Sequence, residues 1–352
     1  MKLSLKRSLW MFFIGLLFFA GKVIAQPTFE SAVAYLDFIN KKNEVLTTKY
    51  MVYLSAVSHG KSARKVEKRR IDVVNSINET KIDITTMPPW QGDKSFRDTT
   101  VAYLKILNTV FNEDYGKIVN MEEIAEQSYD AMEAYMLAQD KAYEKLNEAG
   151  EKQRETEKQF AAKNNIKLLE STSELGNKAK IAGDVLAHCN EMYLVFFKPY
   201  KQEAYLIEAM NQKDLVGMQQ DINSLKKFAE EGLEKLKTMK GYNGDASLIA
   251  ACRNMLNFYK SEVARSTAFT DYFLKEESFL KIKKQFDSKP SSKRTQQDID
   301  QYNQAVNDIN YARKNFNDTN NDLNKERAAA LNNWNKTYND YLDDHMPKQA
   351  RQ

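Results

Sequence analysis

The hexapeptide WQGDKS at residues 90–95 recurs as YNGDAS at residues 242–247, an offset of 152 residues. Five more identities stand in the same order at this offset: Lys49, Tyr53, Leu54, Lys61 and Leu104 match Lys201, Tyr205, Leu206, Lys213 and Leu256. A polar helical sequence would not readily give this much ordered agreement by chance. The pattern therefore indicates a tandem duplication.

A second set of matches lies near the ends of the two copies, at an offset of 173 residues. Here Tyr129, Lys141, Asn147, Lys152 and Arg154 match Tyr302, Lys314, Asn320, Lys325 and Arg327. The change in offset indicates that the second copy has gained about 21 residues around the polar loop at 287–294. We expect residues 28–165 and 172–345 to superpose helix by helix, apart from the extension near 265–295.

The periodicity of the apolar residues predicts helices throughout the chain. Glycine and proline are rare, with 12 and 6 residues, and apolar positions recur every three to four residues with almost no strand-like alternation. We predict an all-α fold in which each copy is an antiparallel four-helix bundle and a long helix joins the two bundles. The alternative is one long bundle built from all the helices. The predicted helices span 29–57, 62–84, 95–111, 120–163, 181–212, 214–239, 245–286 and 296–341.

Several predicted helix ends rest on local signals. Asp93 or Ser95 is the expected cap of the third helix, Tyr115 with Gly116 is its expected end, and Asn120 is the expected cap of the fourth helix. Thr295 is the expected cap of the last helix.

The N-terminus has the pattern of a cleaved signal peptide. Three basic residues precede an apolar run at 9–20, and Val23-Ile24-Ala25 offers the small residues that a signal peptidase recognises. About 12 apolar residues are too few for the roughly 20 that span a bilayer. We therefore expect residues 1–25 to be removed, bundles at 26–165 and 166–345, and a disordered tail at 346–352, with no transmembrane segment in the mature chain.

The charge balance and the cysteines limit the class of protein. The formal charge of +4 comes from the signal, because its removal lowers the 52 basic residues by four, to the 48 that equal the acidic residues. A neutral mature chain does not favour a nucleic-acid partner. The two cysteines, Cys189 and Cys252, are candidates for a disulfide in an exported protein, and two isolated buried thiols are the alternative.

No pattern in the sequence demands catalysis or a bound metal. The three histidines, His59, His188 and His345, are far apart and form no Glu-x-x-His or HExxH pair, so we expect no enzyme, cofactor or metal. The fourth helix carries a stripe of large side chains that could line an apolar ligand groove, but packing against the neighbouring helices explains it without a ligand and is the interpretation we favour. The stripe contains Tyr129, Met132, Met136, Gln139, Tyr143 and Leu146.

The repeated turns are the best candidates for recognition. Pro88, Pro89 and Trp90 would make a rigid surface knob in the first copy, and Tyr242 stands at the matching position in the second. The alternative is that both aromatic rings fold back over the end of their bundle. Recurrence in both copies favours this alternative, since a duplicated fold element needs no shared ligand.

An export signal followed by a duplicated, tyrosine-rich helical region resembles the poorly characterised exported helical surface or periplasmic proteins of spirochaetes and Bacteroidota. The resemblance is one of general pattern, and it implies a location in the periplasm, at the cell surface or outside the cell. Our first hypothesis is a non-enzymatic helical-bundle protein that binds a macromolecular partner or an envelope component. The alternative is a carrier that holds a small apolar or metal ligand between the helices of a bundle.

Overall fold

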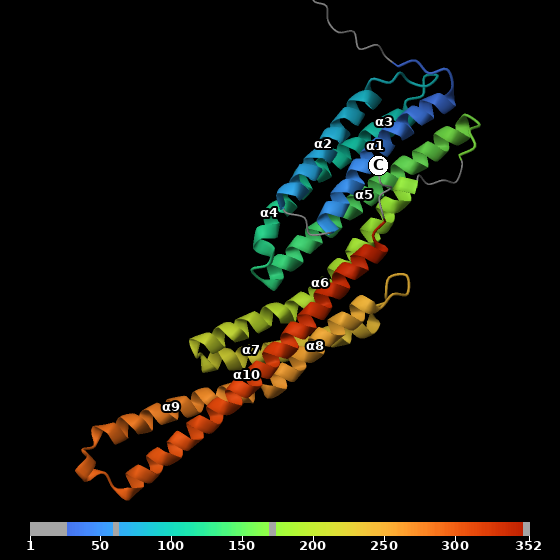
Figure 1. The fold of residues 1–352 in the computed structure, drawn as a ribbon. Coiled ribbons are helices and arrows are strands. Elements are labelled where there is room, and N and C mark those ends of the chain that lie inside the picture. Colours follow the sequence, from blue (N-terminus) through green and yellow to red (C-terminus); the bar gives the residue numbers. More distant parts are fainter. Residues whose placement is uncertain (1–26, 59–62, 169–173, 348–352) are drawn as a thin grey trace, which may run out of the picture.

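A computed structural model describes residues 27–58, 63–168 and 174–347, so the predicted signal peptide and His59 lie outside the described residues. Within these ranges the chain is all-helical, which confirms the predicted class (Figure 1). The N-terminal part, residues 27–168, contains α1 (Ala32–Ser58), α2 (Ala63–Thr85), α3 (Ser95–Thr109), a π-helical turn η1 (Val110–Asp114), α4 (Tyr115–Ala125) and α5 (Tyr129–Lys163).

The predicted end of the third helix, at Tyr115 and Gly116, is wrong. The chain does not stop at Gly116 but passes through the π turn η1 into α4, which ends at Ala125. A glycine ends a helix when it adopts a positive φ, and Gly116 is not among the described residues that do so. The cap predicted at Asn120 is therefore also wrong, and Ser128 caps α5 by accepting a hydrogen bond from the Ala131 N–H at 3.2 Å.

The two parts are not joined by one continuous helix, contrary to the prediction. The last helix of the N-terminal part, α5, ends at Lys163, and Asn165 has a φ of +54°, which turns the chain out of the helix. The next helix, α6, begins at Glu174. The predicted break at residues 164–165 is correct, but α6 folds back against α1 and α5 and does not continue the line of α5.

The C-terminal part, residues 174–347, ends in a long hairpin. Its elements are α6 (Glu174–Gln212), α7 (Leu215–Thr238), α8 (Ser247–Arg265), α9 (Thr267–Ser288), the 3₁₀ turn η2 (Ser291–Lys293) and α10 (Gln296–His345). The predicted helix at 245–286 is interrupted at Ser266, between α8 and α9. Thr295 caps α10 in a reciprocal capping box with Asp298, as its position in the sequence indicates.

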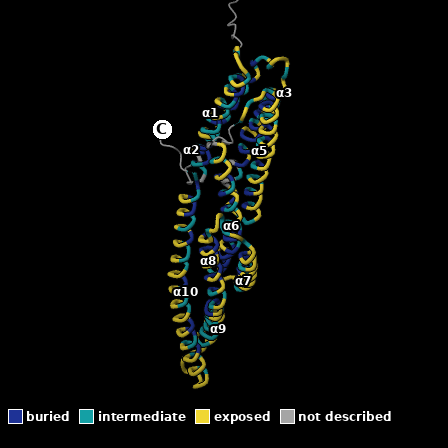
Figure 2. The backbone as a smooth tube through the Cα atoms, turned by 90° about the vertical axis from the view of Figure 1, so that its right-hand side faces the viewer, coloured by how far each residue is buried: buried dark blue, intermediate teal, exposed yellow. Residues whose placement is uncertain are grey.

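Helices that follow one another pack side by side in both parts. In the N-terminal part α1 contacts α2, α2 contacts α3, and α3 and α4 contact α5. In the C-terminal part α6 contacts α7, α7 contacts α8, and α8 and α9 contact α10. Figures 1 and 2 show an elongated molecule with α1–α5 at one end, the hairpin of α9 and α10 at the other, and the C-terminal end of α10 back beside the N-terminal part.

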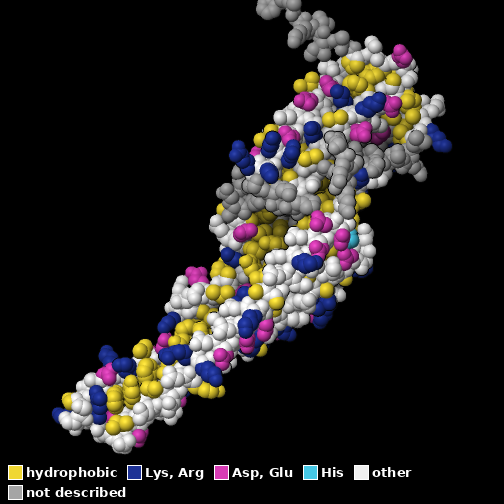
Figure 3. Space-filling model, viewed as in Figure 1, with side chains coloured by type: hydrophobic (Ala, Val, Ile, Leu, Met, Phe, Trp, Pro, Cys, Tyr) yellow, Lys and Arg dark blue, Asp and Glu magenta, His cyan; other side chains and the backbone are white. Residues whose placement is uncertain are grey.

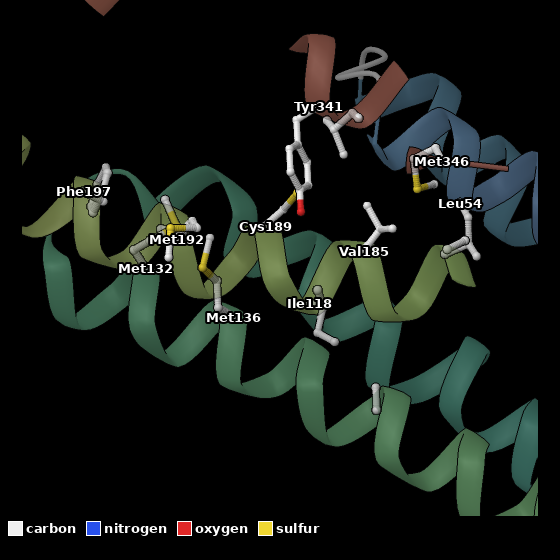
Figure 4. Close-up of a cluster of buried hydrophobic side chains, with 14 of the residues drawn as sticks. Leu54, Ile118, Met132, Met136, Val185, Cys189, Met192, Phe197, Tyr341 and Met346 are labelled. Atoms are coloured by element: carbon white, nitrogen blue, oxygen red, sulfur yellow. The ribbon is translucent and has the colours of Figure 1, made fainter. Parts of the chain in front are cut away.

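A continuous set of buried apolar side chains runs through both parts. In Figure 4, Met132 and Met136 of α5 lie beside Met192 of α6, so the methionines of the predicted stripe belong to this core. Met346 is also buried, so the prediction of a disordered tail that begins at residue 346 is wrong for this residue, and residues 348–352 lie outside the described residues. Among the described helices, none is both long enough and apolar enough to cross a bilayer.

Candidate functional site: a tyrosine-lined cavity

The turn at residues 88–93 folds its aromatic ring inward. The Trp90 Nε1–H donates to Asn164 Oδ1 at 2.8 Å, and the Trp90 ring centroid lies 5.9 Å from that of Tyr35. The Tyr35 hydroxyl donates to the Pro88 carbonyl at 3.1 Å. Trp90 and Pro88 are half-buried, and Pro89 is exposed. The turn thus covers the end of the N-terminal part. This geometry agrees with the alternative in which the aromatic ring folds back over the end of the bundle and forms no surface knob.

The second turn has the same form with different partners. Tyr242 is half-buried and meets the ring of His345 edge to face, with centroids 5.6 Å apart. His345 Nε2 lies 2.8 Å from Asp245 Oδ2, which ties the end of α10 to this turn and lowers the pKa of Asp245.

The two cysteines are free and buried. Cys189 lies in α6 and Cys252 in α8, and burial raises the pKa of each thiol to about 12. Thiolates would therefore be scarce at neutral pH, which argues against a nucleophilic role. In Figure 4 the hydroxyl of Tyr341 points toward Cys189.

His188 does not belong to a metal site in the described part of the chain. No group of three His, Cys, Asp or Glu side chains there is close enough to hold a metal ion. The His188 ring stacks on Tyr341 with centroids 5.8 Å apart, and its Nε2 is buried without a hydrogen-bond partner. Burial lowers the pKa of His188, which keeps the imidazole neutral.

A cavity of about 340 Å³ opens where the two parts meet. We call it the tyrosine cavity because six tyrosines line it. Its lining comes from α1, α4, α5, α6 and α10 and comprises Tyr50, Tyr53, Leu54, Val57, Tyr115, Tyr135, Gln139, Asp140, Tyr143, Gly183, Leu186, Ala187, Asn190, Tyr338 and Asn339. Figure 3 shows hydrophobic side chains gathered in a hollow near the middle of the molecule. This volume falls within the range of roughly 300–1,000 Å³ that is usual for small-molecule sites.

The tyrosine rings are held in fixed orientations by their neighbours. Tyr53 packs edge to face against Tyr115, with centroids 5.7 Å apart and planes at 64°. Both rings also contact Phe111, at the start of the π turn. Burial raises the pKa values of Tyr50, Tyr53 and Tyr115, so their hydroxyls stay protonated at neutral pH.

Gly183 makes room for one wall of the cavity. A Cβ atom at this position would lie only 2.2 Å from Cε2 and 2.4 Å from the hydroxyl oxygen of Tyr143. The Tyr143 ring therefore lies across the α6 backbone, and its hydroxyl donates to Asp184 Oδ1 at 3.4 Å. An alanine at position 183 would displace this ring.

Three polar side chains of the cavity come from the neighbouring helices α5 and α6. Asn190 of α6 donates through its Nδ2 to Gln139 Oε1 of α5 at 3.1 Å and also hydrogen-bonds Asp140. Asp140 is more than a third exposed and stands at the rim. Its pKa is raised chiefly by desolvation, with the neighbouring carboxylates Glu144 and Glu191 adding to the shift.

A second buried polar group lies outside the cavity, among α6, α8 and α10. The Arg327 guanidinium donates to Glu203 Oε1 at 2.5 Å and to Glu262 Oε1 at 2.6 Å, and both carboxyl groups are almost fully buried. Burial, followed by the like charge of Glu203, raises the pKa of Glu262 to about 8. This group links three helices that are distant in the sequence.

Sequence reasoning found some members of the cavity but not the cavity. Gln139 and Tyr143 belong to the predicted stripe of α5, whereas Met132 and Met136 of the same stripe do not line the cavity. Tyr338 and Asn339 are about 200 residues away from the α5 positions, so no local pattern connects them. No family model, curated protein or solved structure matches the chain.

Proposed function

We propose that this chain is a non-enzymatic binding protein that holds a small molecule in the tyrosine cavity. The cavity itself is the observation that carries the proposal: it has the volume of a ligand site, rigid aromatic walls and a few convergent polar groups. This proposal follows the alternative hypothesis from the sequence, with the site moved from the interior of one bundle to the junction of the two parts.

The lining supports binding rather than catalysis. Asp140 is the one carboxylate among the described lining residues, and the other ionisable groups there are tyrosines. General acid–base catalysis is most efficient when a group's pKa lies near the working pH. The raised pKa values of Tyr50, Tyr53 and Tyr115 remove these hydroxyls from that range.

A glycine substitution tests the proposal. The protein purified from its own host should carry a small molecule that native mass spectrometry detects. The variant Gly183→Ala should carry little or none of this molecule, because the new Cβ atom displaces the Tyr143 ring. Gly150→Ala in α5 is the matched control, since its Cβ would meet nothing closer than Arg154 Nη1 at 3.7 Å. A cavity that is empty in the wild type, or equal occupancy in both variants, would overturn the proposal.

The location proposed for this function is the cell envelope or the extracellular space. The basic residues, apolar run and small residues of positions 1–25 support export, and so does the resemblance to exported helical proteins. N-terminal sequencing of protein from its own host tests this: a chain that starts at Gln26 agrees with export, and a chain that retains residues 1–25 contradicts signal cleavage.

We also propose that the fold is a tandem duplication of a four-helix bundle. The two turns support it in detail: Gln91 and Asn243 have φ values of +48° and +50°, and Gly92 and Gly244 have +87° and +86°. In each turn the aspartate accepts a hydrogen bond from the backbone N–H two residues later, at 2.8 Å in both cases. The order of helix contacts is also the same in the two parts, if the π turn and α4 of the first part correspond to α9 of the second.

Binding of a macromolecular partner or an envelope component is the second candidate function. The hairpin of α9 with residues 296–317 of α10, which we call the arm, projects from the rest of the molecule (Figure 1). It leaves Leu274, Leu280 and Tyr311 exposed, Tyr311 by 76%. A photo-crosslinker placed at position 311 in cells should capture one specific partner if the arm binds it, and a crosslinker at exposed Val216 of α7 should not.

A further inference from the structure

We propose that the ligand of the tyrosine cavity is a small organic cation, an alkylammonium or arylalkylammonium ion with an apolar body. This inference rests on the proposed function and names the class of molecule that the site would take. It comes from three features of the lining: its aromatic faces, its charge, and the hydrogen-bonding groups that are left for a ligand.

The aromatic lining suits a cation. The face of an aromatic ring carries negative potential, and it attracts a cation that lies within about 6 Å of the centroid. Six tyrosines from the four helices α1, α4, α5 and α10 surround the cavity. Because Tyr53 and Tyr115 meet edge to face, their faces point in different directions, so the rings form walls on several sides of a bound group.

The charge of the lining has one sign. Asp140 stands at the rim, and the two charged groups that act on it are the carboxylates Glu144 and Glu191. Among the described lining residues there is no Lys, Arg or His. Lys180, whose charge acts on Tyr143, is paired with Asp184 at 2.9 Å. An anionic ligand would face Asp140 without a cationic partner, whereas an ammonium ion would supply the missing charge.

Among the polar side chains that α5 and α6 contribute, Asp140 is the one that accepts hydrogen bonds and cannot donate when ionised. The side-chain amide of Asn190 donates to Gln139 Oε1 and hydrogen-bonds Asp140. A carboxylate has about four lone-pair sites, so Asp140 can still accept from a ligand. A positively charged hydrogen-bond donor therefore fits beside Asp140 better than a neutral acceptor does.

Isothermal titration calorimetry of the purified full-length mature protein, stripped of endogenous ligand, tests the inference. The probes are choline and 2-phenylethylammonium, with their neutral counterparts 3,3-dimethylbutan-1-ol and 2-phenylethanol. We expect at least one cation to bind at least about tenfold more tightly than its neutral counterpart, which corresponds to roughly 1.4 kcal/mol. Asp140→Asn should weaken the binding of that cation about tenfold and leave the neutral counterpart unchanged.

Asp130→Asn is the matched control, because it removes the same charge from an exposed position on α5 away from the cavity. Equal affinity for a cation and its neutral counterpart would overturn the cation inference and leave the proposed function standing. Equal effects of Asp140→Asn and Asp130→Asn would overturn the role of Asp140 and with it the inference. If none of the four probes binds and Gly183→Ala retains the endogenous molecule, both the inference and the proposed function fail.

Discussion

Single residues decide how the three helices α6, α8 and α10 are held together. Two buried carboxyl groups share one guanidinium, and a buried ion pair loses much of its Coulombic gain to desolvation. Removing only one of the three side chains is costly, because a buried charge is then left without a partner. The group therefore fixes the relative position of the helices more than it adds net stability.

Arg327→Met should lower the free energy of unfolding by about 3–5 kcal/mol, since it strands two buried carboxyl groups. Urea unfolding followed by circular dichroism measures the loss. The control is Arg265→Met, which breaks the more exposed pair with Glu326 and should cost at most about 1 kcal/mol. The double variant Arg327→Met with Glu203→Gln should be more stable than Arg327→Met alone; a further loss of stability would contradict our account of the group.

The raised pKa of Glu262 predicts a pH dependence of stability. Its pKa is about 8 in the folded protein and 4.5 in its unperturbed state, so the folded protein binds the proton more tightly. The stabilising contribution is then complete below pH 4.5 and is lost as the pH rises through 8. The melting temperature of the wild type should fall relative to that of Glu262→Gln between pH 5 and pH 9. Parallel pH profiles of the two proteins would show that Glu262 does not titrate in this range.

The two cysteines should behave as buried, free thiols. In protein that has not been reduced, a thiol reagent at pH 8 should react slowly with the native state and titrate two thiols after unfolding in guanidinium. The reason is the burial that raises the pKa of Cys189 and Cys252 to about 12. If the unfolded, unreduced protein offers no thiol, the disulfide considered from the sequence is present instead.

At the scale of elements, local signals predicted the helices better than they predicted the connections. Thr295 and Asp214 cap their helices because side-chain acceptors next to free N–H groups act locally. The π turn depends on tertiary contacts instead: it brings both Phe111 and Tyr115 to the buried face, where they contact Tyr53. Sequence spacing around Gly116 could not reveal that tertiary packing outweighs a helix-stop signal.

Arg70 of α2 supports this π turn. Its Nη1 donates to the Phe111 carbonyl at 2.6 Å, and its other nitrogens donate to Glu67. Arg70→Met should cost about 1–3 kcal/mol, because it removes a charge-assisted hydrogen bond from a largely buried position. It should also weaken ligand binding severalfold by releasing Tyr115 into the cavity. Arg69→Met, which loses only an exposed pair with Asp72, is the control, and equal effects of the two variants in chemical unfolding and calorimetry would disprove the role of Arg70.

At the scale of the whole molecule, the tyrosine cavity exists because residues far apart in the sequence meet. Tyr50 and Tyr53 come from the first described helix and Tyr338 from the last, and α6 contacts both of these helices. The repeat in the sequence predicts that the two parts are similar. It does not predict which surfaces of the two parts contact each other. The proposed insertion of about 21 residues, by contrast, is inferred from the offsets alone, and the loop at 287–294 around which it is placed lies in the arm.

The shared cavity and core predict that the two parts unfold together. The contacts of α6 with α1 and α5, and of Met346 with the core, bury apolar side chains from both parts in common. In the mature chain the variant Trp90→Phe leaves Trp334 as the one tryptophan; its ring is buried and stacks on Phe196 of α6 with centroids 4.5 Å apart. Trp334 fluorescence and far-ultraviolet circular dichroism should then give the same urea midpoint in this variant. A ligand of the cavity should raise both midpoints equally, because it contacts both parts. Two separate transitions, with only one of them sensitive to the ligand, would mean that the parts are independent and that the cavity belongs to one of them alone.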